Sequence, residues 1–578
     1  MRSGIQPFAI GLALVFLLRA AYAQAGAQAS VDADVILRNG KIVTIDQNFS
    51  IAQAIAIRGE SILAVGSNAE VGHYAGPRTK IVDLAGKTVI PGLIDDHYHM
   101  LSKAVDQYLG VEIALVPSIV AMQQAIKQKA DSTPVGETIY TTSGWLPEQL
   151  AEHRTLNRRD LDAVSPRNPV VVQGGHTMYL NSLALQKLGI GRDTPSPAGG
   201  YIDKDPRTGE PTGLLVDNAM AAASQLIPVP TRQQKIDALR VAQRKENSVG
   251  ITSIREPGIS ADDMRVYEEL LNRGELTLRV SMNLNLDPHR PTSSLVEQLR
   301  QWGVSTGFGN PMLRIDGIGE FGIDGGFEAA LMSQPYVGTS RVQTGGGFYG
   351  LQRIPTEEFE TVLREANRLG WRGSIHTVGD KAMDVVLDTY EKANQDVPIS
   401  RKRWVIEHAH YTRPDQFARI KKMDVTISTQ FHPYMAAKTM IDNWGTERAS
   451  KAMRVRDWLD AGVRVGGGSD WSLVPANPFW MMYFFITRDT RLWGVLGADQ
   501  RVTREEALRM MTMNNAYLTF DESRKGSLAA GKLADVLVLA DDFLSVPEAN
   551  IKSIRVLLTM VGGKVVYRDP QSFSSLQQ

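Results

Sequence analysis

Several histidines of this chain directly follow short apolar runs, at points where a strand would end. His97 and His99 follow a run that begins at residue 89, His376 follows a second run, His408 a third, and Asp470 comes after a fourth. Imidazole and carboxylate groups are ligands of Zn²⁺ and, less often, of Mn²⁺, Fe²⁺ or Ni²⁺. Because residues two apart on a strand point to the same side, His97 and His99 can share one ion. The chain has no cysteine, which excludes thiolate ligands, disulfides and a cysteine nucleophile.

Each of these signals also has an ordinary structural explanation. A His-x-His pair often occurs without a metal, a single histidine after a strand is often a buried core residue, and Ser469-Asp470 can cap a helix. The combination at the ends of separate strands is more specific than any one signal. It predicts a divalent metal site with one or two ions, and zinc is the ion that these ligands favour.

The elements that must position these residues alternate between helix and strand. Apolar residues at 359, 362, 363 and 366 have the spacing of one helix face. The strands predicted in this part of the chain are 374–376, 404–408, 425–428 and 463–467. Such alternation is typical of parallel strands with crossover helices. We therefore expect an α/β fold built on a (β/α)8 TIM-type barrel, whose active site lies at the carboxyl ends of the strands.

The two ends of the chain share a sequence pattern that differs from that of the middle. Short β-type runs between residues 35 and 65, and again between 536 and 567, are broken by turns such as Asn39-Gly40 and Gly562-Gly563. We expect both ends to form one composite β-sandwich, with the barrel inserted between them. The predicted boundaries are 34–90 and 523–569 for the sandwich and 91–522 for the barrel.

The first residues have the character of an export signal. A basic start is followed by an apolar run at 8–18 and by Ala21-Tyr22-Ala23, which fits cleavage after residue 23. The run is shorter than the ~20 residues that span a bilayer. An uncleaved anchor and a buried N-terminal helix are the alternatives. We expect residues 1–23 to be a signal peptide, the mature protein to be periplasmic or secreted, and no stable membrane insertion once the leader is removed.

Charge and composition restrict the partners. The 578 residues contain 63 Lys plus Arg and 63 Asp plus Glu, so the formal net charge is zero, and 43% of residues are hydrophobic. A nucleic-acid-binding protein needs a concentrated excess of positive charge, so no nucleic-acid partner is expected. The hydrophobic content is that of a folded globular protein rather than of a disordered one.

The stretches around the predicted ligands resemble the amidohydrolase superfamily of metal-dependent hydrolases, and most of all its branch that contains N-substituted formamide deformylase. The matching text is PGLIDDHYH at 91–99, GHTMYLNSLAL at 175–185, IHTVGD at 375–380, IEH at 406–408, GSDW at 468–471 and GSLAAGKLAD at 526–535. The resemblance runs from about residue 34 to about residue 569. It implies a (β/α)8 barrel with a composite β-sandwich, in agreement with the patterns above.

The resemblance also implies roles for the metal ligands. His97 and His99 would hold the more buried ion together with Asp470, and His376 and His408 would hold the second. Asp470 would also act as the general base.

Two positions depart from this branch. Its members commonly carry a lysine four residues before an Asp-Gly, whose carboxylated form can bridge two metals, and Glu320 stands there in this chain. A glutamate brings its own carboxylate, so we expect Glu320 to be a metal ligand. The alternative is that Glu320 lies behind the ligands and only one ion binds. Gly174 stands where the branch often has Asp, which would alter substrate contacts near His176.

The predicted reaction is hydrolysis of a non-peptide carbon–nitrogen bond in a small amide or N-substituted formamide. Hydroxide generated at the metal attacks the carbonyl, and Asp470 passes the proton to the leaving nitrogen. His176 is the candidate donor to the oxyanion, with a structural histidine as its alternative. The predicted substrate contacts are His176, Gln430, His432 and Trp471.

Two other kinds of protein compete with this interpretation. Residues 303–307 match the G-x-S-x-G motif of serine hydrolases, which requires a strand before it and a helix after it. A non-catalytic regulatory or binding protein on the same scaffold is the second, because some relatives are described as exoenzyme regulators. A homodimer is compatible with the resemblance, although composition alone does not indicate it.

Overall fold

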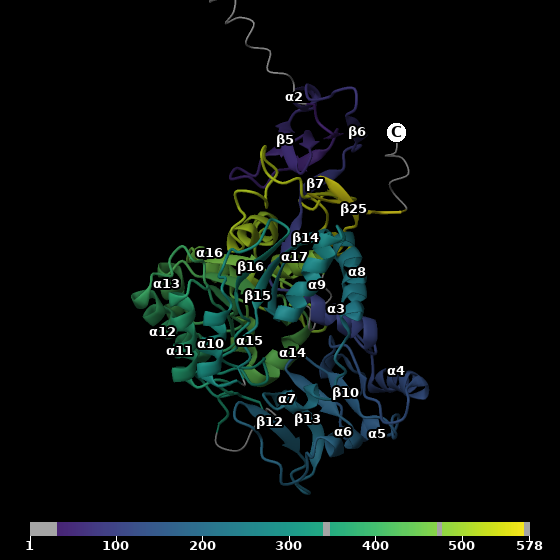
Figure 1. The fold of residues 1–578 in the computed structure, drawn as a ribbon, viewed down its shortest axis with the longest axis vertical. Helices are drawn as coiled ribbons and strands as arrows, with labels where there is room; N and C mark the ends of the chain where they lie inside the picture. The colour runs from purple at the N-terminus through teal and green to yellow at the C-terminus, as the bar shows by residue number, and fades with distance from the viewer. Residues whose placement is uncertain (1–31, 289, 339–346, 471–476, 571–578) are drawn as a thin grey trace, which may run out of the picture.

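The computed structural model describes residues 32–288, 290–338, 347–470 and 477–570. The predicted leader at 1–23 and the predicted substrate contact Trp471 lie outside these residues. Figure 1 shows an elongated molecule, with strands β5 (Ser61–Gly66) and β6 (Lys80–Asp83) near one end and β12 (Gly200–Lys204) and β13 (Pro211–Asp217) at the other. The strands that carry the predicted ligands lie between these two regions.

The middle of the molecule contains two four-stranded sheets in which all neighbours are parallel. Their orders are β16-β15-β14-β8 and β17-β18-β19-β20. The strands are β8 (Leu93–Asp95), β14 (Ile251–Ile259), β15 (Arg279–Leu284), β16 (Leu313–Ile318), β17 (Ser374–Thr377), β18 (Val405–His408), β19 (Thr426–Thr429) and β20 (Arg464–Gly467). The predicted strands at 374–376, 404–408, 425–428 and 463–467 are thus confirmed to within one or two residues at each end.

Two contacts connect these sheets at both of their edges. A parallel bridge between Ile318 and Gly373 joins the end of β16 to the residue before β17. The Asp96 amide donates to the Gly467 carbonyl at 3.2 Å, which joins the end of β8 to β20. The carboxyl ends of both sheets therefore lie on the same side of the molecule.

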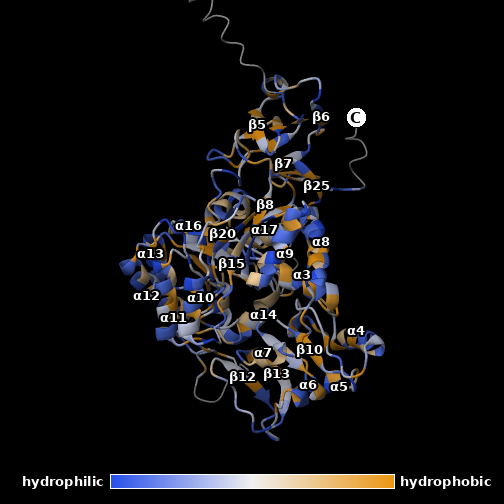
Figure 2. Ribbon diagram, in the orientation of Figure 1, coloured by the Kyte–Doolittle hydropathy of each residue, from blue (hydrophilic) through white to orange (hydrophobic). Residues whose placement is uncertain are grey.

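Amphipathic helices pack around these strands. Helix α11 (Thr356–Arg368) buries Phe359, Val362, Leu363 and Ala366, so the predicted helix face is confirmed. Figure 2 shows hydrophilic residues along α11, α12 and α13 at the edge of the molecule. The other helices of this region are α3 (Met100–Leu109), α8 (Arg232–Ser248), α9 (Ala261–Asn272), α10 (Thr292–Gln301), α12 (Asp380–Asp396), α13 (Pro414–Lys422), α14 (Pro433–Trp444), α15 (Thr446–Ser450), α16 (Val455–Asp460), α17 (Pro478–Thr487), α18 (Arg504–Arg509) and α19 (Asn515–Leu518).

Both chain ends contribute strands to one six-stranded sheet of order β25-β24-β23-β7-β2-β3. In its centre, Val89 of β7 pairs with Val538 of β23. A four-stranded sheet of order β5-β4-β1-β6 shares a buried apolar cluster with it. The remaining strands of the two sheets are β1 (Val35–Arg38), β2 (Lys41–Val43), β3 (Ile51–Ala52), β4 (Ala54–Arg58), β7 (Thr88–Pro91), β23 (Val536–Leu539), β24 (Val556–Val561) and β25 (Lys564–Arg568), with α2 (Asn68–Gly72) beside them.

A third region, which the sequence patterns did not distinguish, is inserted between β8 and β14. It is a five-stranded sheet of order β12-β13-β11-β10-β9, in which β9 (Ile139–Tyr140), β10 (Val170–Gln173) and β11 (Thr177–Leu180) accompany β12 and β13. The helices of this region are α4 (Ile119–Ser132), α5 (Arg158–Asp162), α6 (Ser182–Lys187) and α7 (Met220–Ser224). Its apolar cluster includes Trp145, Tyr179 and Val216. The region carries His176, one residue before β11.

Two further expectations from the sequence can be compared with the observed helices and strands. Ser305 follows helix α10 and precedes strand β16, which is the reverse of the strand–turn–helix order that a serine nucleophile requires. Within the described part of the chain, every helix is too short or too polar to cross a bilayer.

A buried ion pair joins the parallel strands to the C-terminal segment, and it generates a stability prediction. Arg279 of β15 donates to both carboxylate oxygens of Asp535 at 2.8 and 2.9 Å, and both residues are buried. Removal of one partner leaves a buried, uncompensated charge. We expect Asp535→Ala to lower the free energy of unfolding by about 3–5 kcal/mol in urea denaturation. Asp131→Ala, which breaks an exposed i,i+4 pair with Lys127, is the control and should unfold like the wild type. Equal midpoints for both variants would contradict the prediction.

Candidate metal centre

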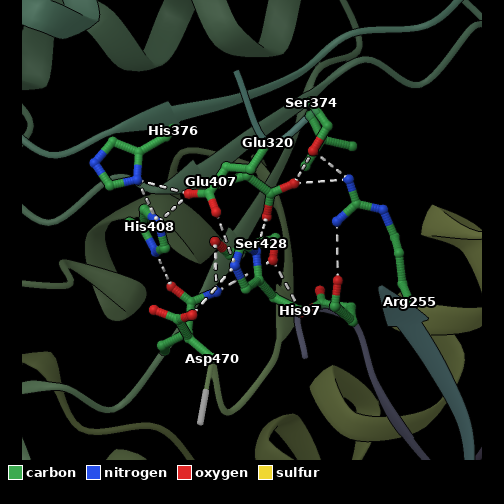
Figure 3. A network of polar contacts seen from close by, with 12 residues as sticks. His97, Arg255, Glu320, Ser374, His376, Glu407, His408, Ser428 and Asp470 are labelled. Atoms are coloured by element: carbon green, nitrogen blue, oxygen red, sulfur yellow. Dashed lines mark hydrogen bonds and ion pairs between the residues drawn. The ribbon is translucent and has the colours of Figure 1, made fainter. Parts of the chain in front are cut away.

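The carboxylate of Glu320 lies between two groups of histidines (Figure 3). Its Oε1 atom is 2.6 Å from His376 Nδ1 and 2.6 Å from His408 Nε2. Its Oε2 atom is 3.4 Å from Nε2 of both His97 and His99. Each oxygen of one carboxylate therefore faces a different set of imidazole nitrogens.

Asp470 completes the group around His97 and His99. Its Oδ1 atom lies 3.5 Å from His97 Nε2 and 3.4 Å from His99 Nε2. The ligand atoms of His97, His99 and Glu320 lie within 4.8 Å of one another, as do those of Glu320, His376 and His408. The structure thus brings together all the residues that the sequence predicts as ligands, although nearly four hundred positions separate the first from the last.

The side chains around Glu320 fit a divalent cation. His97 Nε2 is buried and makes no hydrogen bond among the described residues, yet it points toward two carboxylate oxygens. Neutral imidazole nitrogens and ionised carboxylates are the donors that Zn²⁺ accepts, at metal–ligand distances near 2 Å. A cation that bound the lone pair of His97 Nε2 would give this buried nitrogen the partner that it lacks among the described residues.

The strand ends are tied together beneath the ligands. The Asp95 carboxylate, at the end of β8, accepts hydrogen bonds from the amides of His97 at 3.1 Å and of Ser469 at 3.0 Å. Gly468 permits this close approach, because a Cβ there would lie 2.5 Å from the His97 nitrogen. Asp95 therefore holds the segments of His97 and Asp470 side by side.

A second layer of polar groups orients the imidazoles of this centre. His97 Nδ1 lies 2.6 Å from Glu407 Oε2, and Glu407 Oε1 accepts from Arg255 at 2.7 Å (Figure 3). Arg255 also donates to Asp316 at 2.8 Å, and all three charged groups are buried. A carboxylate on one imidazole nitrogen favours the tautomer that leaves the other nitrogen free for a metal.

Gln430 has the same relation to His408. Its Oε1 atom lies 2.6 Å from His408 Nδ1, and the side chain is fully buried. It is not among the residues that line the cavity in front of the ligands. Gln430 was predicted as a substrate contact; the structure places it behind His408, where it orients the imidazole.

Opposite charges in the centre move the pKa values of its groups. Burial alone would raise the pKa of Glu320, but His408, His97 and His376 hold it well below 4.5. In the same way, His432 and His97 hold the pKa of Asp470 well below 3.8. Burial and the neighbouring His408 lower the pKa of His376 to about 4. Near neutral pH both carboxylates are therefore ionised and His376 is neutral. Although burial opposes it, the neighbouring carboxylates raise the pKa of His97 and His408, so a cation that binds these two imidazoles must displace their protons.

A cavity of about 720 Å³ opens in front of this centre. Its lining includes His376, His408 and Asp470, together with His176 and His432. Its apolar and aromatic walls include Trp145, Leu146, Tyr179, Leu214, Val216, Phe327 and Trp493. Of the predicted substrate contacts that the structure describes, His176 and His432 thus face the cavity and Gln430 does not.

Three residues of the site were missed by the sequence analysis. Asp217 lies 2.8 Å from His176 Nδ1, and His410 Nε2 lies 2.9 Å from Nδ1 of His432. Glu407 is the partner of His97. Glu407 and His410 flank His408 closely in the sequence, which could have marked them, whereas nothing in the sequence around Asp217 pointed to His176.

Together, the parallel strand ends and the His and carboxylate centre define a metal-dependent hydrolase. Residues 80–567 match the family model described as "Amidohydrolase family". The chain therefore belongs to the amidohydrolase family.

Individual relatives span nearly the whole chain. N-substituted formamide deformylase of Arthrobacter pascens is 28% identical over 557 residues, covering 92% of this chain and 98% of that protein. Protein LONG AFTER FAR-RED 3 of Arabidopsis thaliana is 30% identical over 556 residues, covering 93% and 92%. The crystal structure of an uncharacterized metal-dependent hydrolase from Pyrococcus horikoshii superposes with a TM-score of 0.68 at 25% identity, covering 89% of this chain and 99% of that one.

The two-sided geometry of Glu320 generates a prediction for metal content. The combined change His376→Ala and His408→Ala removes both imidazoles that face Glu320 Oε1. We expect less metal per chain in elemental analysis of this variant, with part retained by the group around His97. His73→Ala, which removes a histidine on an exposed segment of the N-terminal region, is the control and should keep the full content. Unchanged metal in the double variant would show that His376 and His408 are not ligands.

Proposed function

We propose that this protein hydrolyses a carbon–nitrogen bond other than a peptide bond, in a small amide or N-substituted formamide. The observation that carries the proposal is the Glu320 carboxylate, with one oxygen toward each group of imidazoles, beside His376 and His408, which line a cavity of small-molecule size. The name of the Arthrobacter pascens relative, N-substituted formamide deformylase, supports the substrate class. The apolar and aromatic walls of the cavity support an apolar group on the substrate nitrogen.

The metal assignment is part of the proposal. His97, His99 and Asp470 would hold one ion and His376 and His408 the other, with Glu320 shared between them, and zinc is the favoured metal. A divalent cation supplies acidification of water, from a pKa of 15.7 to about 7, and polarisation of a carbonyl oxygen.

Asp470 is suited to move the proton of the reaction. One of its oxygens faces His97 and His99, and the other lies 3.2 Å from His432 Nε2. Because its pKa is held well below 3.8, it is ionised at neutral pH and can accept a proton from the attacking water. The water oxygen forms the new bond to the carbonyl carbon, the carbon–nitrogen bond breaks, and Asp470 delivers the proton to the leaving nitrogen. His176 donates to the oxygen that gains negative charge.

The proposal extends to the scaffold. The Ile318–Gly373 bridge and the Asp96–Gly467 hydrogen bond support closure of the eight parallel strands into one (β/α)8 barrel. The strand pairing of β7 with β23, and the apolar cluster shared by both terminal sheets, support a composite β-sandwich from residues 34–90 and 523–569. The barrel would then comprise residues 91–522, with the inserted five-stranded sheet among them.

The activity test combines a substrate panel with one active-site variant. The purified protein, loaded with zinc, is assayed against N-substituted formamides, other secondary amides, carbamates, lactones and peptides. We expect turnover of formamides or amides, and a loss of about 10²–10⁴-fold in kcat for Asp470→Asn, since this variant lacks the proton acceptor. Metal content and thermal unfolding of the variant serve as controls.

The outcomes separate the alternatives. Wild-type rates in Asp470→Asn would exclude Asp470 as the base. A protein that binds metal but hydrolyses no member of the panel would favour the non-catalytic regulatory function instead.

We also propose that the protein is exported to the periplasm or beyond the cell after removal of residues 1–23. The basic start, the apolar run and Ala21-Tyr22-Ala23 support this proposal. Expression of the full chain in a bacterial host followed by N-terminal sequencing is expected to yield a protein that begins at Gln24. An intact Met1 in a cytoplasmic fraction would contradict it.

A further inference from the structure

His176 and Asp217 are brought together by the inserted five-stranded sheet. His176 immediately precedes β11, Asp217 ends β13, and these two strands pair antiparallel. Beyond the last ladder pair, the Asp217 amide donates to the His176 carbonyl at 3.1 Å. The two side chains therefore start from adjacent points of the backbone and meet on the side that faces the metal centre.

The contact between the two side chains is specific. Asp217 Oδ1 lies 2.8 Å from His176 Nδ1, and the Asp217 side chain is fully buried, whereas 31% of the His176 side chain is exposed in the cavity. The other oxygen of Asp217 is buried and has no hydrogen-bond partner among the described residues. Asp217 also has a φ of 48°, a left-handed conformation that is uncommon for residues other than glycine. Among the described residues, His176 is thus the side chain to which the Asp217 carboxylate is hydrogen-bonded.

Two consecutive glycines make room for this pair. A Cβ on Gly325 would lie 2.2 Å from Asp217 Oδ2, and a Cβ on Gly326 would lie 3.0 Å from His176 Cδ2. These glycines follow Glu320 on the same segment. The segment that supplies the central carboxylate of the metal centre therefore also provides the space in which the pair is held.

The pair directs one nitrogen of His176 toward the reaction. The His176 ring lies 5.0 Å, centroid to centroid, from the ring of His376. Because Nδ1 is engaged by Asp217, Nε2 is the nitrogen that can meet a substrate in the cavity. A carboxylate behind an imidazole fixes its orientation and stabilises the ring when it donates a hydrogen bond to developing negative charge.

We propose that Asp217 is a positioning residue that holds His176 so that its Nε2 donates to the acyl oxygen of the substrate. The proposal rests on the amide hydrolysis proposed above, in which that oxygen gains negative charge. It assigns to the inserted sheet a direct part in the reaction, through a residue that does not itself touch the substrate.

A double-mutant cycle tests the coupling of the two residues. We expect His176→Ala to lower kcat by about 100- to 1,000-fold, as for the loss of one oxyanion donor. Asp217→Ala is expected to lower kcat by about 10- to 100-fold with little change in KM, the range for a lost partner of a functional histidine. In the His176→Ala background, Asp217→Ala should have no further effect. Asp217→Asn, which can still accept from Nδ1, should retain more activity than Asp217→Ala.

A backbone variant provides an independent perturbation. Gly325→Ala keeps both side chains but places a methyl group against the Asp217 carboxylate, so it should reproduce the kcat loss of Asp217→Ala. Gly191→Ala is the matched control, since a Cβ there meets no atom within 4 Å, and it should behave as the wild type. Equal metal content in all variants excludes an indirect effect through the ligands.

An NMR measurement on His176 tests its contact with Asp217 without measuring activity. Its result therefore does not depend on the proposed reaction. In protein labelled with ¹⁵N histidine, the His176 signal, assigned by its loss in His176→Ala, is expected to show Nδ1 protonated in the wild type and a changed tautomer mixture in Asp217→Ala. An unchanged signal, or equal and additive losses of kcat in the cycle, would overturn the positioning role. Failure of the wild type on every substrate would contradict the reaction, while the tautomer result would still decide the pairing.

Discussion

The arrangement of this molecule depends on one carboxylate placed between two groups of imidazoles. Glu320 directs Oε1 toward His376 and His408, and Oε2 toward His97 and His99. A carboxylate and several imidazoles are costly to remove from water unless opposite charge compensates them. In the proposed centre, a cation at each side of Glu320 would provide that compensation, and the strand ends must then converge to within a few ångströms. The parallel order of the strands is the arrangement that brings their carboxyl ends to one place.

The ligands cannot be held by their own rotamers alone, and the structure uses buried partners to orient them. Glu407 fixes His97 from behind, and Arg255 balances the charge of Glu407 while it also binds Asp316. Gln430 performs the same task for His408 without a charge. A buried ionic network of this kind contributes little to stability by itself, but removal of one member leaves the others uncompensated. Its effect is to select, for His97 and for His408, the nitrogen that faces Glu320.

The elements predicted best are those that their own local pattern determines. The face of α11 follows from apolar spacing, and β17 and β18 follow from short apolar runs that end in histidine. Five of the six predicted ligands were accessible for the same reason, because each lies at the end of a strand or within four residues after it. Glu320 was found only through its position relative to Asp324-Gly325, and Gln430, predicted as a substrate contact, contacts His408 and does not line the cavity. Sequence spacing indicates the end of a strand at which a side chain lies, but its direction there is decided by packing.

The inserted five-stranded sheet escaped prediction because nothing in its local pattern separates it from the surrounding strands. Its strands are short, and its functional pair joins His176 to Asp217 across a contact between strands that are not consecutive along the chain. The two parts of the structure therefore have different roles: the ends of the parallel strands supply the predicted ligands, whereas the inserted region supplies Trp145, Tyr179 and Val216 to the wall of the cavity. A change in this region can therefore reshape the wall of the cavity without moving Glu320 or the imidazoles around it. His176 is the exception. Gly325 and Gly326, which leave room for Asp217 and His176, belong to the segment that carries Glu320. This segment therefore connects the inserted region to the candidate metal centre.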